Sequence, residues 1–237
     1  MKILLIFVLF FFLPQVLSAQ KGRESYQVGS ATDVNKVIPY AGRYQYPAFT
    51  DGQVHFRNGK TSNAKMNYNL VHGEVMFISL LRDTLLFADN NFVDRVQIGN
   101  SVYYYNPGHG HIEIAGDYGD LKLGKKQFLA QLGHEKYAAY GQYSSTAAIS
   151  SYSTFMNKQG EFRYLDANEK VLMKRRAVYF LIDKNQRFYL ANRANLLKIF
   201  PSQKSAISRF LRDNEINLEV EPDLEKTLEF CSTLSLR

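Results

Sequence analysis

The chain has 237 residues, a formal net charge of +7 and one cysteine, and this length fits one domain or one domain with a small appendage. The single cysteine, Cys231, excludes an internal disulfide. The basic residues are scattered, with one tight cluster at Lys174, Arg175 and Arg176. The charge therefore indicates a solvated surface or an affinity for anionic envelope polymers, and it does not indicate nucleic-acid binding.

The N-terminus has the pattern of a cleavable secretory signal peptide over residues 1–19. Lys2 precedes an apolar stretch at residues 3–13, and the small residues Ser18 and Ala19 close the segment. We place the cleavage between Ala19 and Gln20, with an uncleaved N-terminal anchor as the alternative. The apolar stretch is shorter than the roughly 20 residues that span a bilayer, and no later stretch is longer. We therefore expect an exported protein without a transmembrane segment after cleavage.

The mature chain divides into three predicted segments. Residues 20–43 are mixed and polar and predict an N-terminal arm, residues 44–192 predict an antiparallel β-rich domain, and residues 193–237 predict a helical segment packed on the sheet. Within the second segment, apolar and polar residues alternate in short runs joined by tight turns. Asn58 with Gly59, and Gly99 with Asn100, are turn pairs that accept positive φ. The fold class is therefore mainly β (α+β).

The connections between the expected strands are too short for helical crossovers, which excludes a parallel sheet. The expected strands are residues 54–57, 64–70, 74–80, 84–87, 92–98, 102–105, 112–114, 121–123, 162–165, 171–182 and 187–190. They predict an antiparallel β-meander that forms a sheet, an open barrel or a sandwich. Residues 137–157 contain no charge and predict a mobile loop or a long hairpin.

Two to three helices are expected after residue 193, because the apolar spacing changes from two to between three and four. Pro201 and Pro222 stand where helices can begin, since proline is tolerated in the first turn. The apolar positions of these helices are Leu196, Leu197, Ile199, Phe200, Ala206, Ile207, Phe210, Leu211, Leu224, Leu228, Cys231 and Leu234. Cys231 lies on such an apolar stripe, so we expect a buried, unreactive thiol.

Several segments resemble secreted proteins that are widespread in Bacteroidetes. They are F-T-D-G-Q-V-H-F-R-N-G-K (residues 49–60), M-N-Y-N-L (66–70), V-D-R-V-Q-I-G (93–99) and K-I-F-P-S-Q-K-S-A-I-S-R-F-L-R-D-N (198–214). The resemblance implies export into a Gram-negative envelope and a β-rich body, and it carries no catalytic residues. A chain that ends in helices, without a β-rich secretion domain, is expected to be periplasmic or envelope-associated.

The clearest candidate for metal chemistry is His109, His111 and Glu113. In an extended segment these three side chains share one face, and two histidines with a carboxylate can hold zinc or iron. Gly110 indicates a turn instead, and the face opposite Ile112 is expected to be solvent-exposed. Surface histidines in a hairpin therefore explain the pattern better than a metal site, and we expect no cofactor.

Two further groups have a structural and a chemical interpretation. Asp117 and Asp120 flank a glycine turn, where carboxylates more often support the backbone than act as acid and base. Tyr137, Tyr140, Tyr143 and Tyr152 surround the uncharged stretch and are the speculative ligand-binding residues, because tyrosine offers a flat apolar face with a polar tip. Ordinary strand packing is the alternative for these tyrosines.

The sequence contains no G-x-S-x-G, G-x-G-x-x-G or P-loop motif. The leading hypothesis is an exported, non-enzymatic envelope protein that acts by binding an envelope component or by structural support. The first alternative is a periplasmic carrier of a lipid or another small apolar ligand, because a curved meander covered by helices can enclose a cavity. The second alternative is an unrecognised hydrolase that would use some of His55, His72, His109, His111 and His134.

Overall fold

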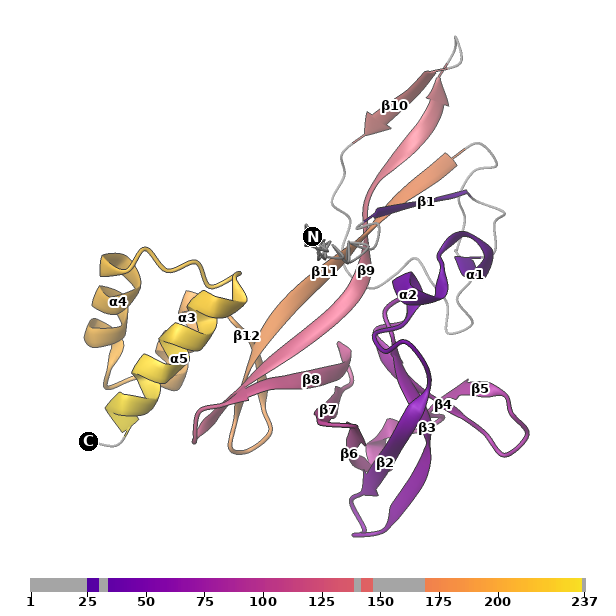
Figure 1. Cartoon of the computed structure of the whole chain (residues 1–237). Coiled ribbons are helices and arrows are strands. Elements are labelled where there is room, and N and C mark those ends of the chain that lie inside the picture. Colours follow the sequence, from indigo (N-terminus) through magenta and orange to yellow (C-terminus); the bar gives the residue numbers. More distant parts are fainter. Residues whose placement is uncertain (1–24, 30–33, 139–141, 147–168, 236–237) are drawn as a thin grey trace, which may run out of the picture.

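The computed structural model describes residues 25–29, 34–138, 142–146 and 169–235 (Figure 1). Its strands are β1 (Ser25–Gly29), β2 (Thr50–Phe56), β3 (Thr61–Asn69), β4 (Glu74–Ile78), β5 (Thr84–Leu86), β6 (Val93–Ile98), β7 (Ser101–Asn106), β8 (Gly110–Asp117), β9 (Leu121–Ala138), β10 (Gln142–Thr146), β11 (Glu169–Asp183) and β12 (Phe188–Leu190). They pair antiparallel in one open sheet with the order β1-β11-β9-β8-β7-β6-β2-β3-β4-β5, while β10 pairs with β9 and β12 with β11. This arrangement confirms the mainly β, antiparallel fold class.

Tight turns form where the sequence places glycine. Gly59 has φ +81° and joins β2 to β3, and its N–H donates to the Phe56 carbonyl at 2.9 Å. Gly99 has φ +56° and joins β6 to β7. Residues with a Cβ rarely adopt this backbone conformation, so these two glycines set where the chain reverses.

The meander curls until the end of β3 lies against β9. The Leu129 N–H donates to the Leu70 carbonyl, and Tyr68 Oη donates to the Gln127 carbonyl, each at 2.8 Å. These contacts are isolated bonds and not a strand ladder, since β3 and β9 are not neighbours in the sheet order. The sheet therefore encloses an interior without closing into a barrel.

Side chains fill that interior. The aromatic rings of Tyr68 and Tyr103 stack at its centre with centroids 5.4 Å apart. The buried residues of this core are Val28, Ile38, Val54, Met66, Tyr68, Leu70, Val75, Val93, Val96, Ile98, Tyr103, Leu129, Val171 and Met173. Most of them come from alternate positions of the strands, as expected for strands with one face on a core.

A buried amide fixes the chain segment that precedes β2. Asn67 is fully buried in β3, where its Nδ2 donates to the carbonyls of Tyr46 at 2.9 Å and Ala48 at 3.2 Å. Its Oδ1 accepts from the Tyr46 N–H at 3.1 Å. A buried polar side chain with all of these bonds satisfied holds its surroundings in one arrangement.

Three helices, α3 (Arg193–Ile199), α4 (Lys204–Asp213) and α5 (Glu221–Ser235), gather beside the lower part of the β9–β11 ribbon, away from the β2–β7 meander (Figure 1). Their apolar side chains pack on Leu121, Leu123 and Leu181. An ion pair at 2.6 Å joins Lys125 of β9 to Glu221 at the start of α5. The helices therefore cover one face of this ribbon, while Ile112 of β8 forms a separate small core with Phe180 and Ile182 of β11.

The N-terminal segment departs from the expectation of a polar arm over residues 20–43. β1 pairs with β11 at the end of the sheet order, and Val28 is fully buried. Two short helices, α1 (Val34–Val37) and α2 (Tyr40–Arg43), follow it, and Ile38 between them is buried in the same core. Alternation over only five residues, within a polar context, gave too little signal to predict this strand.

The remaining expectations concern the uncharged stretch and the membrane. The predicted strand at 162–165 lies outside the described residues, as does most of the stretch at 137–157. Within the described ranges, no helix is long and apolar enough to cross a bilayer.

Candidate functional site

The expectation that the face opposite Ile112 is solvent-exposed is wrong for His111. The imidazole of His111 is fully buried, and its Nδ1 accepts from the Val75 N–H of β4 at 3.4 Å. The ring of Tyr105 lies against it, with centroids 5.3 Å apart. The curl of the meander brings β4 across this face of β8, and a local strand pattern does not contain that contact.

The other two members of the predicted metal site have partners of their own. Glu113 accepts from Ser101 Oγ at 2.6 Å and from Gln45 Nε2 at 3.0 Å. His109 is exposed, and its ring packs 4.8 Å from that of Phe180, centroid to centroid. Within residues 25–29, 34–138, 142–146 and 169–235, no three His, Cys, Asp or Glu side chains gather as ligands for a metal ion.

A half-buried lysine lies close to His111. Lys126 Nζ donates to the carbonyl of Gly73 at 3.0 Å and to the carbonyl of His109. Burial lowers the pKa of Lys126 to about 8, with the nearby Glu74 acting in the opposite direction. Burial, and secondarily the charge of Lys126, lower the pKa of His111 to about 3.

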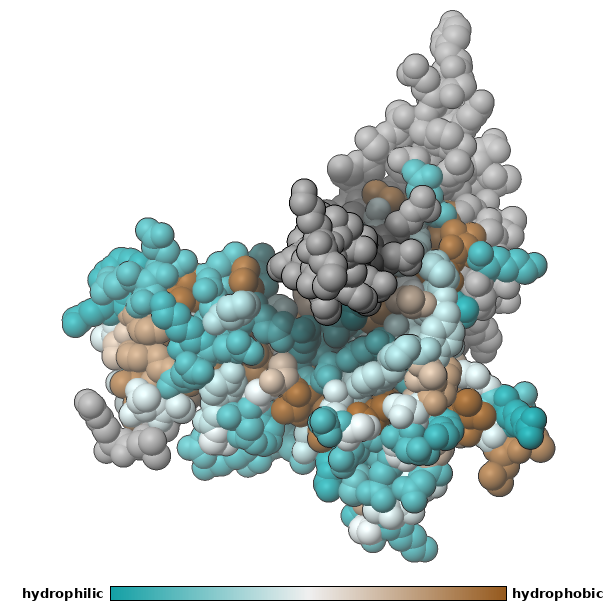
Figure 2. Space-filling view, in the orientation of Figure 1, coloured by the Kyte–Doolittle hydropathy of each residue, from teal (hydrophilic) through white to brown (hydrophobic). Residues whose placement is uncertain are grey.

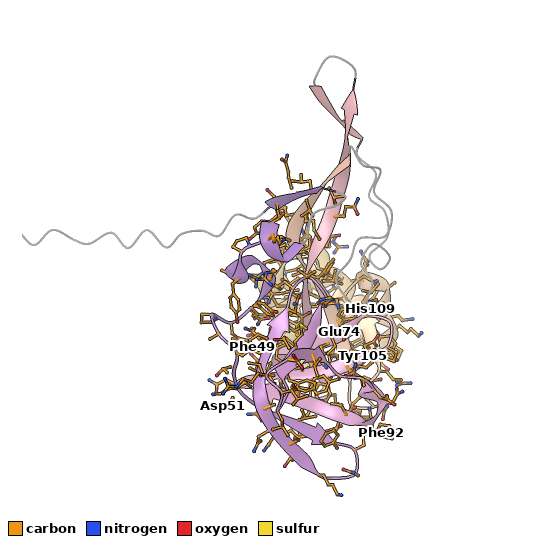
Figure 3. All side chains as sticks on the ribbon, turned by 90° about the vertical axis from the view of Figure 1, so that its right-hand side faces the viewer. Phe49, Asp51, Glu74, Phe92, Tyr105 and His109 are labelled. Atoms are coloured by element: carbon orange, nitrogen blue, oxygen red, sulfur yellow. The ribbon has the colours of Figure 1, made fainter. Side chains whose placement is uncertain are left out.

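This lysine has a structural role. It bonds the turn after β3 to the turn after β7, and Glu74, Tyr105 and His109 lie close together on this side of the molecule (Figure 3). A desolvated lysine can act as a nucleophile when it faces a substrate site. Lys126 instead faces two backbone carbonyls and lines neither of the two hollows described below.

The speculative tyrosine site lies largely outside the described residues. Tyr137 and Tyr143 are register partners in the β9–β10 hairpin. Tyr140 and Tyr152 fall outside the described ranges. The ligand-binding role of these four tyrosines stays a prediction.

Two other sequence candidates have structural roles. Asp117 Oδ1 accepts from the Gly119 N–H at 3.1 Å, and its other oxygen pairs with Lys122, which lowers the pKa of the carboxyl. Cys231 is buried, and burial raises the pKa of its thiol to about 12. A thiol that stays protonated is a poor nucleophile, so the structure agrees with an unreactive cysteine.

The surface of the described residues includes two hollows that are large enough for a small ligand. One, of about 530 Å³, lies between β1 and β11 and is lined by Ser25, Tyr26, Gln27, Val37 and Leu172. The other, of about 410 Å³, is called the β2–β6 hollow here and is lined by His55, Phe56, Arg57, Gly59, Lys60, Asp94 and Arg95. Neither hollow reaches the stacked tyrosines at the centre of the core.

An apolar surface stands at the tip of the β4–β5 hairpin. The exposed fractions are 103% for Leu80, 85% for Leu81 and 43% for Leu85. Hydrophobic side chains are visible at the outer end of this hairpin, which projects from the right-hand side of the molecule (Figure 2). Sequence reasoning missed this surface, although two consecutive leucines beside the Arg82–Asp83 turn imply that one of them points outward from a strand.

The β5 strand that forms the outer side of this hairpin ends the sheet. It pairs with β4 through three residue pairs, and no described strand lies on its other edge. Such an edge leaves backbone N–H and C=O groups available to another chain, and native proteins usually protect it with charge, proline or a bulge. Here the edge strand is only three residues long, and the charged residues Arg82 and Asp83 stand at the turn before it. The hairpin is therefore a candidate interaction surface.

Comparisons with known proteins assign nothing further. No family model matches the chain, and no match was found among the curated proteins or the solved structures with which it was compared.

Proposed function

We propose that this is an exported, envelope-associated protein that acts by binding, without catalysis, through the β4–β5 hairpin. The observation that carries the proposal is the exposed apolar tip, Leu80 and Leu81, beside the open edge of β5. The signal-peptide pattern of residues 1–19 and the resemblance to secreted proteins of Bacteroidetes support export. The proposal assigns no catalytic role to any residue.

The partner that fits this surface is an extended, apolar segment of another envelope protein. A strand laid against β5 would satisfy its free backbone groups, and alternate side chains of that strand would cover the leucines. Leu80 and Leu81 are exposed to water in the free protein. Burial of each leucine by a partner would contribute about 1.5–3 kcal/mol to the free energy of binding. Backbone pairing supplies the orientation, and the leucines supply most of the affinity.

The filled interior favours surface binding over the carrier alternative. A carrier of an apolar ligand needs an enclosed cavity lined by apolar side chains. In the described sheet, Tyr68, Tyr103 and Met66 occupy the position that such a ligand would take. Native mass spectrometry of protein purified gently from its own envelope tests this alternative, because a stoichiometric co-purifying lipid would restore the carrier.

The hairpin proposal is tested with a charged double variant, Leu80→Asp/Leu81→Asp. The matched control is Leu190→Asp/Val220→Asp, which places the same charges at two other exposed apolar positions, 44% and 43% exposed. Envelope proteins captured by the wild-type chain are cross-linked, and the cross-linked peptides are mapped. We expect a partner that cross-links to residues 80–86, that the control retains and that the hairpin variant loses at least about tenfold.

Two results would overturn this proposal. One is a captured partner that the hairpin variant binds as well as the wild-type chain does. The other is flotation of the purified chain with protein-free vesicles of neutral lipid that depends on Leu80 and Leu81, since that result would assign the tip to a membrane surface.

A further inference from the structure

The β2–β6 hollow is built around an irregularity in the sheet. His55 pairs with Arg95, but the next residue of β2, Phe56, pairs with Val93, so Asp94 is an extra residue in β6. A bulge of this kind redirects side chains and is common beside functional sites. The hollow measures about 410 Å³, within the range of roughly 300–1,000 Å³ typical of small-molecule sites.

Three cations and one carboxylate line this hollow. Arg57, Lys60 and Arg95 carry the positive charges, and Asp94 carries the negative one. Asp94 Oδ2 accepts from Arg95 Nη1 at 2.8 Å, so this pair is neutral as a unit. Arg57 and Lys60 are exposed and have no ion-pair partner among the described residues, and they leave the hollow with an excess of positive charge.

The 3₁₀ turn η1 (Asn90–Phe92), which precedes β6, holds Arg57 in position through its backbone. Arg57 Nε donates to the Asn91 carbonyl, and the Arg57 backbone N–H donates to the Phe92 carbonyl, each at 2.9 Å. Within the described part of the chain, its two terminal nitrogens have no bonded partner. A guanidinium fixed through Nε presents its terminal N–H groups to an oxyanion at little further entropic cost.

His55 contributes a donor that has no acceptor. Arg95 Nη2 lies 3.3 Å from His55 Nδ1. Because a guanidinium only donates, Nδ1 must accept, and the proton of the neutral imidazole is then on Nε2. This Nε2 is buried and has no hydrogen-bond partner among the described residues. A buried N–H without an acceptor is costly, and a bound oxyanion would satisfy it.

We propose that the β2–β6 hollow binds a phosphate group, carried either by a small phosphate ester or by the headgroup of an anionic lipid. Arg57 and Lys60 supply charge-assisted hydrogen bonds, and His55 Nε2 supplies a neutral one. Arg95 fixes the tautomer of His55 and is itself held by Asp94. The site is separate from the β4–β5 hairpin, so either proposal can fail alone.

The test measures binding of inorganic phosphate and of glycerol 3-phosphate by calorimetry at low ionic strength. Co-sedimentation with vesicles of phosphatidylglycerol, compared with phosphatidylcholine, then distinguishes a lipid headgroup from a free ester. The variants are Arg57→Gln, Lys60→Gln and His55→Phe, with circular dichroism to confirm that each folds. Lys184→Gln is the matched control, because it removes the same charge from an exposed turn far along the chain.

We expect Arg57→Gln to weaken phosphate binding at least about tenfold, since hydrogen bonds to charged groups contribute roughly 1.5–3 kcal/mol. His55→Phe should also weaken binding, while Lys184→Gln should leave it unchanged. In the wild-type chain, phosphate should shift the NMR resonance of His55 Nε2 but not that of the exposed His109. The absence of saturable binding to all of these probes, or an equal loss in Lys184→Gln, would overturn the assignment.

Discussion

Acidification is expected to destabilise this protein through His111. The imidazole has a pKa of about 3 in the folded chain, because burial and Lys126 disfavour its charged form, against an ordinary value of about 6.5 in the unfolded chain. Between these two values the unfolded chain binds the proton and the folded chain does not. Stability contributed by neutral His111 is therefore present above pH 6.5 and is lost as the pH falls toward 3.

The size of the effect follows from the two pKa values. Between pH 7.5 and pH 5, proton binding by the unfolded chain lowers the free energy of unfolding by about 2 kcal/mol, and by about 3 kcal/mol at pH 4. His72 and His109 also have lowered pKa values because of burial, so they add to the total slope. The contribution of His111 is the part of the pH dependence of the unfolding free energy that is lost when His111 is replaced by a residue that does not titrate.

Urea unfolding at pH 7.5 and pH 5 measures this contribution in the wild-type chain, in His111→Gln and in the control His109→Gln. Glutamine keeps an acceptor for the Val75 N–H. The His111→Gln chain should lose about 2 kcal/mol less than the wild type on acidification. His109→Gln should differ from the wild type by less than His111→Gln does, because His109 is exposed. The reasoning is refuted if His111→Gln keeps the full slope, or if NMR of the wild-type chain shows His111 charged at pH 5.

Three further changes test other parts of the structure. Lys126→Met should abolish a rise in stability between pH 8 and 10.5, because the pKa of Lys126 is lowered to about 8 and only the unfolded chain still binds the proton in that range; urea unfolding across this window measures it. Gly124→Ala should destabilise the chain by about 1–3 kcal/mol, since its Cβ would lie 2.8 Å from Ile112 Cγ2, whereas Gly108→Ala meets no contact under 3.5 Å and should melt almost normally. Asn67→Ala should cost about 2–4 kcal/mol by denaturant unfolding, because it removes the partner of the half-buried backbone N–H and carbonyl of Tyr46.

The sequence predicted the elements of this fold well where the signal is local. Asn58 with Gly59 and Gly99 with Asn100 turn the chain where expected, because positive φ depends on the residues at the turn. The change of apolar spacing after residue 193 likewise predicted the helices on Leu121 and Leu123. Cys231 is buried as its position on an apolar stripe indicated.

The candidate sites were less predictable, because each depends on contacts between distant segments. The alternation at residues 109–113 indicated a solvent-facing histidine pair, yet β4 packs over His111. The β2–β6 hollow needs Arg57 from one strand end and Arg95 from another, and a bulge to orient them. No pattern along the chain shows that these side chains meet.

The amino-acid sequence by itself determined where strands, turns and helices form, since dihedral preferences and apolar periodicity act over a few residues. Only the tertiary structure decided which strand faces receive a second layer, because the curl that seats β3 and β4 on β8 and β9 is set by packing across the whole sheet. The same curl buries His111 and partly covers Lys126, and the end of the sheet order leaves β5 uncovered. The residues of each surface thus determine its chemical character, while the fold determines whether that surface is exposed.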